Sequence, residues 1–404
     1  MTDAHPDLLG ADPRPLFFAI GNADRIGPST PPTHSGAAVR TRARTLAGMQ
    51  KEAITVNDAN HSAWRFVSDE GPYLAGHDVA PCPLSFFTTG MAADYMNEIL
   101  AMARQHDVRI GSPRLILDNL YSMEGSVLRG TMAGGALAPR LTVQCDADSP
   151  DSVLQDLVET AARVAPVSGL LGGAHESLFS LSHNGVELAP SRVSALRGPP
   201  QQDPTEDFFE IARADEPMEH PIRKLAAARR IENERGGINT SLEESQDRVL
   251  HCRGICTVRE DGVRQIDQAL FKPIGSSFRF LSDETSECGG GRAPDAASYI
   301  SAGIAFCFMT QFGRYAEIVK QPLDSCRIVQ DTAFSPGDRR CGKGVGGTAE
   351  AVETHVYLES SGDDEFAREA LDMSEQTCFL HALCRTSLAT SVEIENLPSA
   401  VGSA

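Results

Sequence analysis

The stretch GIAFCFMTQ, residues 303–311, lies in the middle of the segment that decides the fold. That segment, residues 296–319, is mostly apolar and contains no proline, so we expect one long buried helix. Its central residue is Cys307, and the nearby glycine and alanine allow close packing against a neighbouring element. A second cysteine, Cys378, follows in another helix-like segment. A buried thiol either fills a core or reacts, and the rest of the chain bears on that choice.

The composition narrows the class of protein. The chain has 404 residues, 41% of them hydrophobic, which is enough for two or three domains of roughly 150 residues each. A net charge of −19 disfavours nucleic acid and anionic membrane surfaces as partners. The N-terminus lacks a secretion signal, and no apolar run is long enough to span a membrane. Ten irregularly spaced cysteines then predict reduced thiols and a cytoplasmic protein.

Two parts of the chain resemble each other. WRFVSDE at 64–70 matches FRFLSDE at 278–284, and APCPLSFFTTG at 80–90 matches APDAASYISAG at 293–303. The offsets of the two matches agree to within one position, and the later helix-like segments keep the same spacing. A nearly constant offset over about 100 residues indicates a duplication. FFAIGNAD at 17–24 also resembles FFEIARAD at 208–215, which is either an extension of the repeat or a chance similarity of two loops.

Each copy is expected to be an α+β unit. Long helices are predicted at residues 84–105 and 296–319, and second helices at about 149–164, with Ser149 as N-cap, and at 363–384, with a break near residues 374–378. Strands are predicted before and after the long helices, which favours an α+β fold. The expected units are an irregular arm at 1–37, a first unit at 38–190, a linker at 191–246 and a second unit at 247–404.

The second copy resembles the OsmC/Ohr superfamily. The motifs are Asp283-Glu284, then Gly289-Gly290, Pro294 and a helix of small residues with a central cysteine, followed by Cys378 at the position of the family's second cysteine. The resemblance implies two OsmC-like units in one chain. They would form an intrachain pseudo-dimer with two central long helices packed between antiparallel sheets, and a further homo-oligomer is compatible with this arrangement.

The resemblance also implies chemistry. Family members with both cysteines reduce organic hydroperoxides, so Cys307 would form a sulfenic acid and Cys378 would resolve it as a disulfide. An arginine and an acidic residue usually tune the first thiol, and the sequence does not place that arginine. Ohr-like helices open with Asn-Pro-Glu, whereas this chain has APDA at 293–296. The Ohr-type glutamate is therefore missing or replaced.

The first copy lacks both sulfurs. At the offset of the repeat, Asp94 stands where Cys307 is expected and Ala165 stands where Cys378 is expected. The first copy therefore cannot perform this thiol chemistry, and we expect it to complete the fold and to shape the pocket of the second copy.

Several polar residues are candidates for the site. Gln311 and Arg314 follow Cys307 on one helical face, where they would contact substrate, although Arg314 could equally be a solvated helix end. Asp283 and Glu284 end a predicted strand. They could bind substrate or act as general bases, or they could only form a turn.

His381 lies one helical turn after Cys378. It could act as a base in a Cys-His pair, join both thiols at a metal, or form only a backbone hydrogen bond. No Cys-x-x-Cys unit supports a zinc site, and we predict neither a metal nor a cofactor. Cys288 is treated as a loop thiol, and Gly342-Lys343 is rejected as a phosphate loop because Gly344 replaces the required Ser or Thr.

Three functions remain open. The first is reduction of an organic hydroperoxide through Cys307 and Cys378, with a small apolar substrate and a thiol reductant as partners. The second is a hydrolase in which Cys307 attacks a carbonyl and His381 is the base. The third is a protein without catalytic activity that binds a small molecule in an apolar pocket.

Overall fold

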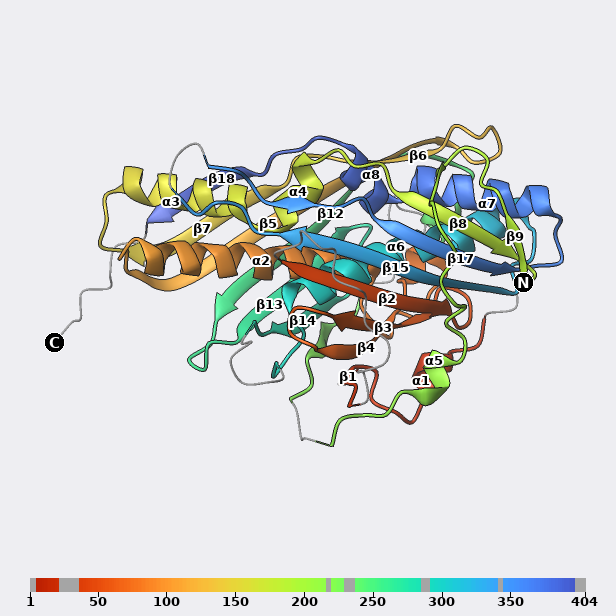
Figure 1. Ribbon diagram of the computed structural model, residues 1–404, viewed down its shortest axis with the longest axis horizontal. Helices are drawn as coiled ribbons and strands as arrows, with labels where there is room; N and C mark the ends of the chain where they lie inside the picture. Colours follow the sequence, from red (N-terminus) through yellow and green to blue (C-terminus); the bar gives the residue numbers. More distant parts are fainter. Residues whose placement is uncertain are drawn as a thin grey trace.

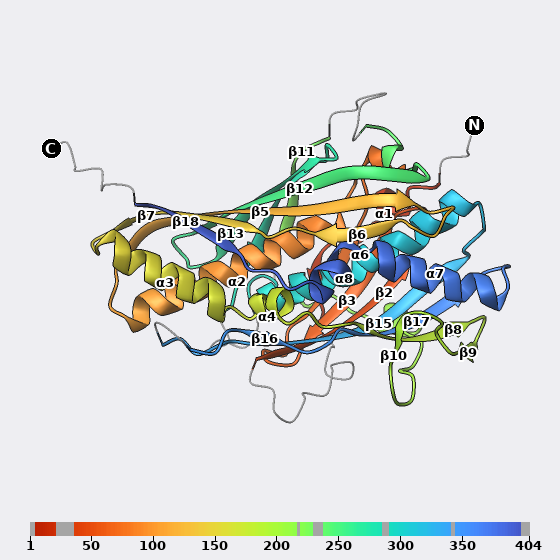
Figure 2. The same ribbon diagram turned by 90° about the horizontal axis from the view of Figure 1, so that it is seen from above.

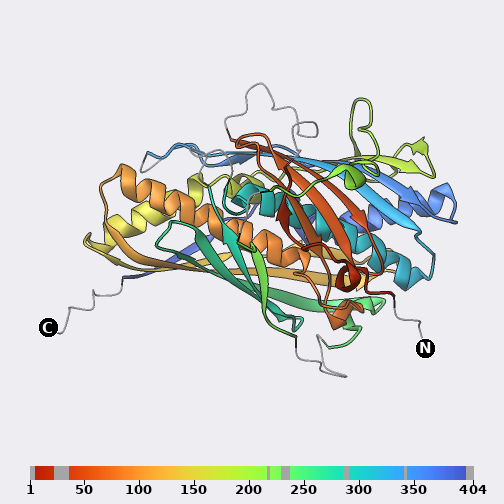
Figure 3. The ribbon, with the colours of Figure 1, turned by 90° about the horizontal axis from the view of Figure 1, so that it is seen from below.

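The fold is α+β, as the sequence predicts. The structure is a computed structural model and describes residues 5–21, 36–215, 219–228, 237–284, 291–340 and 344–396. Two β-sheets lie on opposite sides of two long helices, α2 (Pro83–Gln105) and α6 (Ala296–Val319) (Figures 1 and 2). Figure 3 shows the same helices from the side opposite to Figure 2. The long helix expected at residues 296–319 has these bounds in the structure.

The first sheet combines strands from both halves of the chain. Its path is β1-β4-β3-β2-β15-β17-β8-β10, with β16 paired to β15 and β9 paired to β8. The bounds are β1 Phe18–Ala19, β4 Ala63–Ser68, β3 Lys51–Asn57, β2 Ala37–Thr45, β15 Ser325–Ser335, β17 Glu353–Glu359, β8 Leu178–His183, β10 Ser194–Ala195, β16 Thr348–Ala349 and β9 Val186–Leu188.

The second sheet has the same construction with the halves exchanged. Its path is β11-β14-β13-β12-β5-β7-β18, with β6 paired to β5. The bounds are β11 Ile222–Ala226, β14 Ser277–Ser282, β13 Arg264–Lys272, β12 Ser245–Val258, β5 Ile110–Ser126, β7 Arg140–Ala147, β18 Ser391–Asn396 and β6 Ala133–Ala136.

The two halves are joined in the middle of each sheet. β2 pairs with β15 in the first sheet, and β12 pairs with β5 in the second. The strand pairs β8 with β17, and β18 with β7, are parallel. The expectation of purely antiparallel sheets is therefore wrong at these positions. In each pair, a strand near the end of one half lies beside a strand of the other half. β8 lies beside β17 in the first sheet, and β18 lies beside β7 in the second.

A glycine on each long helix lets the two helices approach closely. A Cβ atom at Gly303 would lie 2.7 Å from the backbone nitrogen of Phe87, and one at Gly90 would lie 2.6 Å from the carbonyl oxygen of Ala296. Both distances are too short for a side chain, so each position requires glycine. Gly90 and Gly303 end the two matching stretches 80–90 and 293–303, so they are equivalent positions of the sequence repeat.

The second helices are interrupted. α3 (Asp151–Val164) is followed by α4 (Val167–Gly172), and α7 (Asp364–Thr377) is followed by α8 (Phe379–Arg385). The break predicted near residues 374–378 falls at Cys378, which caps both helices. The prediction of Ser149 as N-cap is wrong by one residue, because α3 begins at Asp151 and Pro150 precedes it.

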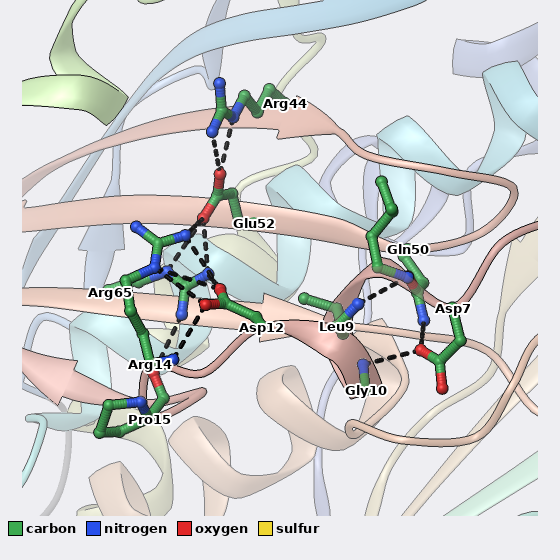
Figure 4. A network of polar contacts seen from close by, with 11 residues as sticks. Asp7, Leu9, Gly10, Asp12, Arg14, Pro15, Arg44, Gln50, Glu52 and Arg65 are labelled. Atoms are coloured by element: carbon green, nitrogen blue, oxygen red, sulfur yellow. Dashed lines mark hydrogen bonds and ion pairs between the residues drawn. The ribbon is translucent and has the colours of Figure 1, made fainter.

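Part of the expected irregular arm forms regular structure. Residues 5–21 contain α1 (Leu8–Ala11), whose first amides donate to the Gln50 side chain at 2.9 and 3.1 Å. Figure 4 shows how the arm meets a buried ion pair, in which Arg65 donates to Glu52 at 2.9 Å and to Asp12 of the arm at 3.0 Å. These contacts fix the arm against β3 and β4.

The segment expected to be a linker adds secondary structure at the sheet edges. It contributes β10, α5 (Asp207–Glu210), β11 and the short helix η3 (Thr240–Leu242). β11 pairs with β14 as β1 pairs with β4, so β11 is the counterpart of β1. Residues 208–215 instead lie against β1, through a bridge between Ile20 and Arg213. The similarity of 17–24 to 208–215 therefore does not extend the repeat.

No helix within the described ranges is both long and apolar enough to cross a membrane. Cys288 and Gly342-Lys343 lie outside the described residues.

Candidate active site

Two thiols meet at the centre of the molecule. Cys307 lies in the middle of α6 and is 2% exposed, and Cys378 lies at the junction of α7 and α8 and is fully buried. Both are free thiols. Burial raises the pKa of the Cys307 thiol well above its ordinary value, and the adjacent, hydrogen-bonded Cys378 raises it further. The backbone amide of Leu380 acts in the opposite direction by donating to the Cys307 sulfur.

Cys307 opens into a small pocket that both halves of the chain build. Its free space is about 40 Å³, enough for a water-sized or peroxide-sized group. The lining is polar along α6, whereas β12 contributes both the charged Arg248 and the apolar Leu250. The lining comprises Glu70, Tyr73, Leu74, Cys82, Pro83, Leu84 and Met123 from the first half, and Ser241, Arg248, Leu250, Leu270, Pro273, Cys307, Thr310, Gln311, Arg314 and Phe379 from the second.

An acidic residue from the first half reaches the thiol helix. Glu70 follows β4, and its carboxylate accepts hydrogen bonds from the Thr310 hydroxyl at 2.9 Å and from the Tyr73 hydroxyl at 2.7 Å. The ammonium group of Lys51, on β3, donates to the same Thr310 oxygen at 2.9 Å. Burial lowers the pKa of Lys51 and raises that of Glu70, while their mutual attraction opposes both shifts. Thr310, one helical turn after Cys307, is therefore hydrogen-bonded to a buried amine and a buried carboxyl group.

The sequence-predicted residues Gln311 and Arg314 lie in this pocket. Arg314 is buried and donates through Nε to the carbonyl oxygen of Ser241 at 2.7 Å and through Nη2 to the sulfur of Met132 at 2.9 Å. Burial, and then the charge of Arg248, lowers the pKa of Arg314 to about 9. The helical face predicted from the spacing of Cys307, Gln311 and Arg314 is therefore the one that faces the pocket.

His381 lies outside the pocket lining. Its Nδ1 is hydrogen-bonded to the Ser177 hydroxyl at 2.7 Å, and its ring packs 4.9 Å from the Phe308 ring and 5.3 Å from the Phe179 ring. Burial, and then the charge of Arg385, lowers the pKa of His381 to about 3, so the imidazole is neutral near pH 7. A neutral imidazole with so low a pKa is a weak base.

Asp283 and Glu284 also lie outside the lining of this pocket. Asp283 accepts a hydrogen bond from Arg292 Nε at 2.8 Å, and Glu284 accepts one from the first amide of α6, at Ala296, at 2.7 Å. Sequence reasoning chose this acidic pair in the copy that carries the thiols. The repeated pair in the other copy contains Glu70, which is the acid that reaches Thr310. The repeated Asp-Glu pair is the sequence feature that points to Glu70. Nothing in the sequence indicates that an acid of the first half reaches the thiol helix of the second half.

Lys51, Thr310, Ser241 and Arg248 were also missed. Lys51 lies within a strand and Thr310 within an apolar helix, where spacing alone does not distinguish them from structural residues. The pairing of the two halves brings them together, and sequence patterns do not show that pairing.

The first half holds a counterpart of this site. Asp94 occupies the place of Cys307 on α2, and its carboxylate accepts a hydrogen bond from the Val167 amide at 2.8 Å. Val167 is the repeat equivalent of Leu380, whose amide donates to Cys307. Ala165 ends α3 as Cys378 ends α7. The two sites therefore share a backbone frame, with a carboxylate in one and a thiol in the other.

Within the described parts of the chain, no group of three or more His, Cys, Asp or Glu side chains could hold a metal ion.

Comparison with known proteins identifies one family. Residues 289–393 match the family model described as OsmC-like protein. Among solved structures, an OsmC-like hydroperoxide resistance protein from Jannaschia sp. CCS1 is 21% identical to this chain. The alignment covers 32% of this chain and 81% of that one, with a TM-score of 0.20. A comparison with curated proteins finds no match.

Proposed function

We propose that this chain, which is OsmC-like over residues 289–393, is a thiol-dependent enzyme that reduces hydroperoxides at Cys307. The observation that carries the proposal is the contact between two buried thiols, Cys307 and Cys378, beside a pocket of peroxide size. A cysteine that only fills the core would require neither a second thiol in contact with it nor a pocket beside it.

The reaction has three steps. The Cys307 thiolate attacks the outer oxygen of the hydroperoxide, the O–O bond breaks, and the alkoxide leaves as an alcohol after taking up a proton. Cys307 is then a sulfenic acid. The Cys378 thiol attacks that sulfur, so that an S–S bond forms and water leaves. An external dithiol finally reduces the disulfide by thiol–disulfide exchange and supplies the two electrons.

The residues around Cys307 would support the first step. The Leu380 amide donates to the sulfur and would stabilise negative charge there. Thr310 couples Lys51 and Glu70 within one helical turn of Cys307, which offers a buried path for a proton. Glu70 would thus take the role of the family's acidic residue.

We further propose that the two halves are OsmC-like units that form an intrachain pseudo-dimer. The support is the matching strand order of the two sheets, the matching glycines at the helix crossing, and a pocket built from both halves. The proposed boundaries are residues 38–190 and 247–404, and a further homo-oligomer is compatible with them. Every cysteine in the described parts is a free thiol, which fits work in a reducing cytoplasm with a thiol reductant.

The two alternatives have less support. In a hydrolase, His381 would have to take the Cys307 proton, but it lies outside the pocket lining and burial lowers its pKa to about 3, which makes it a weak base. A protein that only binds a ligand would not require Cys378 beside Cys307.

The test is consumption of cumene hydroperoxide by the reduced chain in the presence of a dithiol. We expect turnover in the wild type and its loss in Cys307→Ser. Cys145→Ser is the matched control, since Cys145 is a buried thiol on β7, outside the lining of the Cys307 pocket. Equal rates in the wild type and in Cys307→Ser would reject the proposal.

A further inference from the structure

Two arginines share the pocket with Cys307. Arg248 comes from β12 and Arg314 from α6, and both line the pocket. They are close enough that the charge of Arg248 lowers the pKa of Arg314. Like charges held together in a buried space are unfavourable unless negative charge compensates them.

Hydrogen-bond donors of Arg248 lack partners. Nε and Nη1 of Arg248 are buried without a hydrogen bond, and so is the hydroxyl of Ser241. The described bonds of Arg314 run to neutral atoms, a carbonyl oxygen and a thioether. Within the described residues, neither guanidinium forms an ion pair at hydrogen-bonding distance. Buried donors without partners are rare in native proteins and indicate a missing acceptor.

The acid in the same pocket does not fill this role. The two oxygens of Glu70 accept hydrogen bonds from Thr310 and Tyr73. Gln311 is 3% exposed and its Oε1 atom also has no partner. Flipping the amide, so that its nitrogen and oxygen exchange places, would bring an N–H to that position, so Gln311 can become a further donor.

The counterpart site shows that the fold does not require an arginine at the position of Arg314. On α2, Ala101 stands at the position of Arg314 and Glu98 at the position of Gln311. Glu98 is paired with Arg339 at 2.7 and 2.8 Å. The helix face that carries Asp94 is therefore acidic, and its Glu98 is paired with a cation, whereas the face that carries Cys307 is basic.

We propose that this pocket binds a carboxylate between Arg248 and Arg314, with the Ser241 hydroxyl as an additional donor. A carboxylate matches the planar geometry of a guanidinium group and would accept hydrogen bonds from the donors that lack partners. It follows that the preferred substrate is a hydroperoxide that carries a carboxylate. This consequence for the substrate rests on the proposed function, whereas binding of the carboxylate itself does not.

The binding test uses butanoate as the probe and butanamide as its neutral match, measured by titration calorimetry on the reduced chain. Butanoate is expected to bind and to slow alkylation of Cys307, and butanamide is expected to do neither. Arg248→Gln and Arg314→Ala should each weaken butanoate binding tenfold or more, while Arg248→Lys should retain part of it. Arg259→Ala is the control, because Arg259 pairs with Glu219 at the surface. Equal binding of both probes, or binding unchanged in both variants, would overturn the proposal.

A kinetic test separates this inference from the proposed function. A hydroperoxide with a free carboxylate should have a kcat/KM at least tenfold above that of its methyl ester, and Arg248→Gln should remove the difference. Equal reduction of acid and ester would overturn the carboxylate site and leave the peroxidase intact. Butanoate binding without any peroxide reduction would uphold the site and reject the proposed function.

Discussion

The Glu70 carboxylate accepts a 2.9 Å hydrogen bond from the hydroxyl of Thr310, although the two residues lie 240 positions apart in the chain. Glu70 belongs to the first half of the chain, and Thr310 lies one helical turn after Cys307. The first half therefore contributes an acid to the pocket that contains Cys307. This relationship leads to the first prediction.

Glu70→Gln should lower kcat/KM for hydroperoxide about 100-fold or more, because an acid–base group typically contributes about 10²–10⁴-fold. The amide cannot balance the charge of Lys51 or carry a proton. Glu284→Gln, at the repeated position, is the comparison, since Glu284 caps α6 outside the lining of this pocket. A larger loss in Glu284→Gln than in Glu70→Gln would contradict the assignment of the acid.

The rate of the first step should rise with pH. Burial raises the pKa of Cys307 well above its ordinary value, so the resting thiol is protonated near neutrality and only its small thiolate fraction reacts. That fraction, and with it the single-turnover rate, should increase about tenfold per pH unit between pH 6 and 8. Stopped-flow measurement of sulfenic acid formation would show this slope. A rate independent of pH over this range would indicate a thiolate that is already formed.

Stability should fall in mild acid because of His381. Burial lowers its pKa to about 3, whereas an imidazole in the unfolded chain titrates near 6.5. Between these values the unfolded chain binds a proton that the folded chain does not, so stability present above pH 6.5 is lost as the pH falls.

The slope from this group is at most about 1.4 kcal/mol per pH unit. His381→Phe, which keeps an aromatic ring beside Phe179 and Phe308, should flatten the dependence in urea unfolding at pH 7, 6 and 5. His106→Phe, at an exposed position, is the control. An unchanged slope in His381→Phe would contradict the assignment.

The ion-pair network under the N-terminal arm should be a stability determinant. Glu52 is 1% exposed and lies between Arg65 and Arg44, with Nε distances of 2.9 and 2.7 Å (Figure 4). Glu52→Gln removes a buried carboxylate and leaves Arg65 with Asp12 as its remaining anionic partner, so we expect a loss of about 3 kcal/mol, the lower end of the range for breaking a buried ion pair. Arg14→Ala should cost less than about 1 kcal/mol, because the Arg14 side chain is 47% exposed. Similar losses in both variants, measured by urea unfolding, would refute the central role of Glu52.

Much of the fold was predictable because it depends on local patterns. The apolar run at residues 296–319 specifies α6, and the repeat predicts its counterpart α2. The spacing of Cys307, Gln311 and Arg314 identifies the face of α6 that lines the pocket, because it depends only on helical geometry.

The rest of the site depends on which strands pair across the two halves. β2 and β3 lie in a sheet completed by β15, and this pairing brings Lys51 and Glu70 to Thr310. Asp283 and Glu284 stand at the end of a strand in the second copy, but the pocket contains Glu70 from the first copy, and His381 lies against Ser177 outside the pocket lining. No periodicity encodes such contacts between distant segments.

In the most direct test of the proposed peroxidase reaction, the reduced chain is treated with one equivalent of cumene hydroperoxide, and its disulfides are mapped by mass spectrometry. We predict a single new bond between Cys307 and Cys378, loss of one equivalent of peroxide, and a trappable sulfenic acid on Cys307 in Cys378→Ser. Unconsumed peroxide, or consumption with both thiols still free and no sulfenic acid on Cys307, would contradict it.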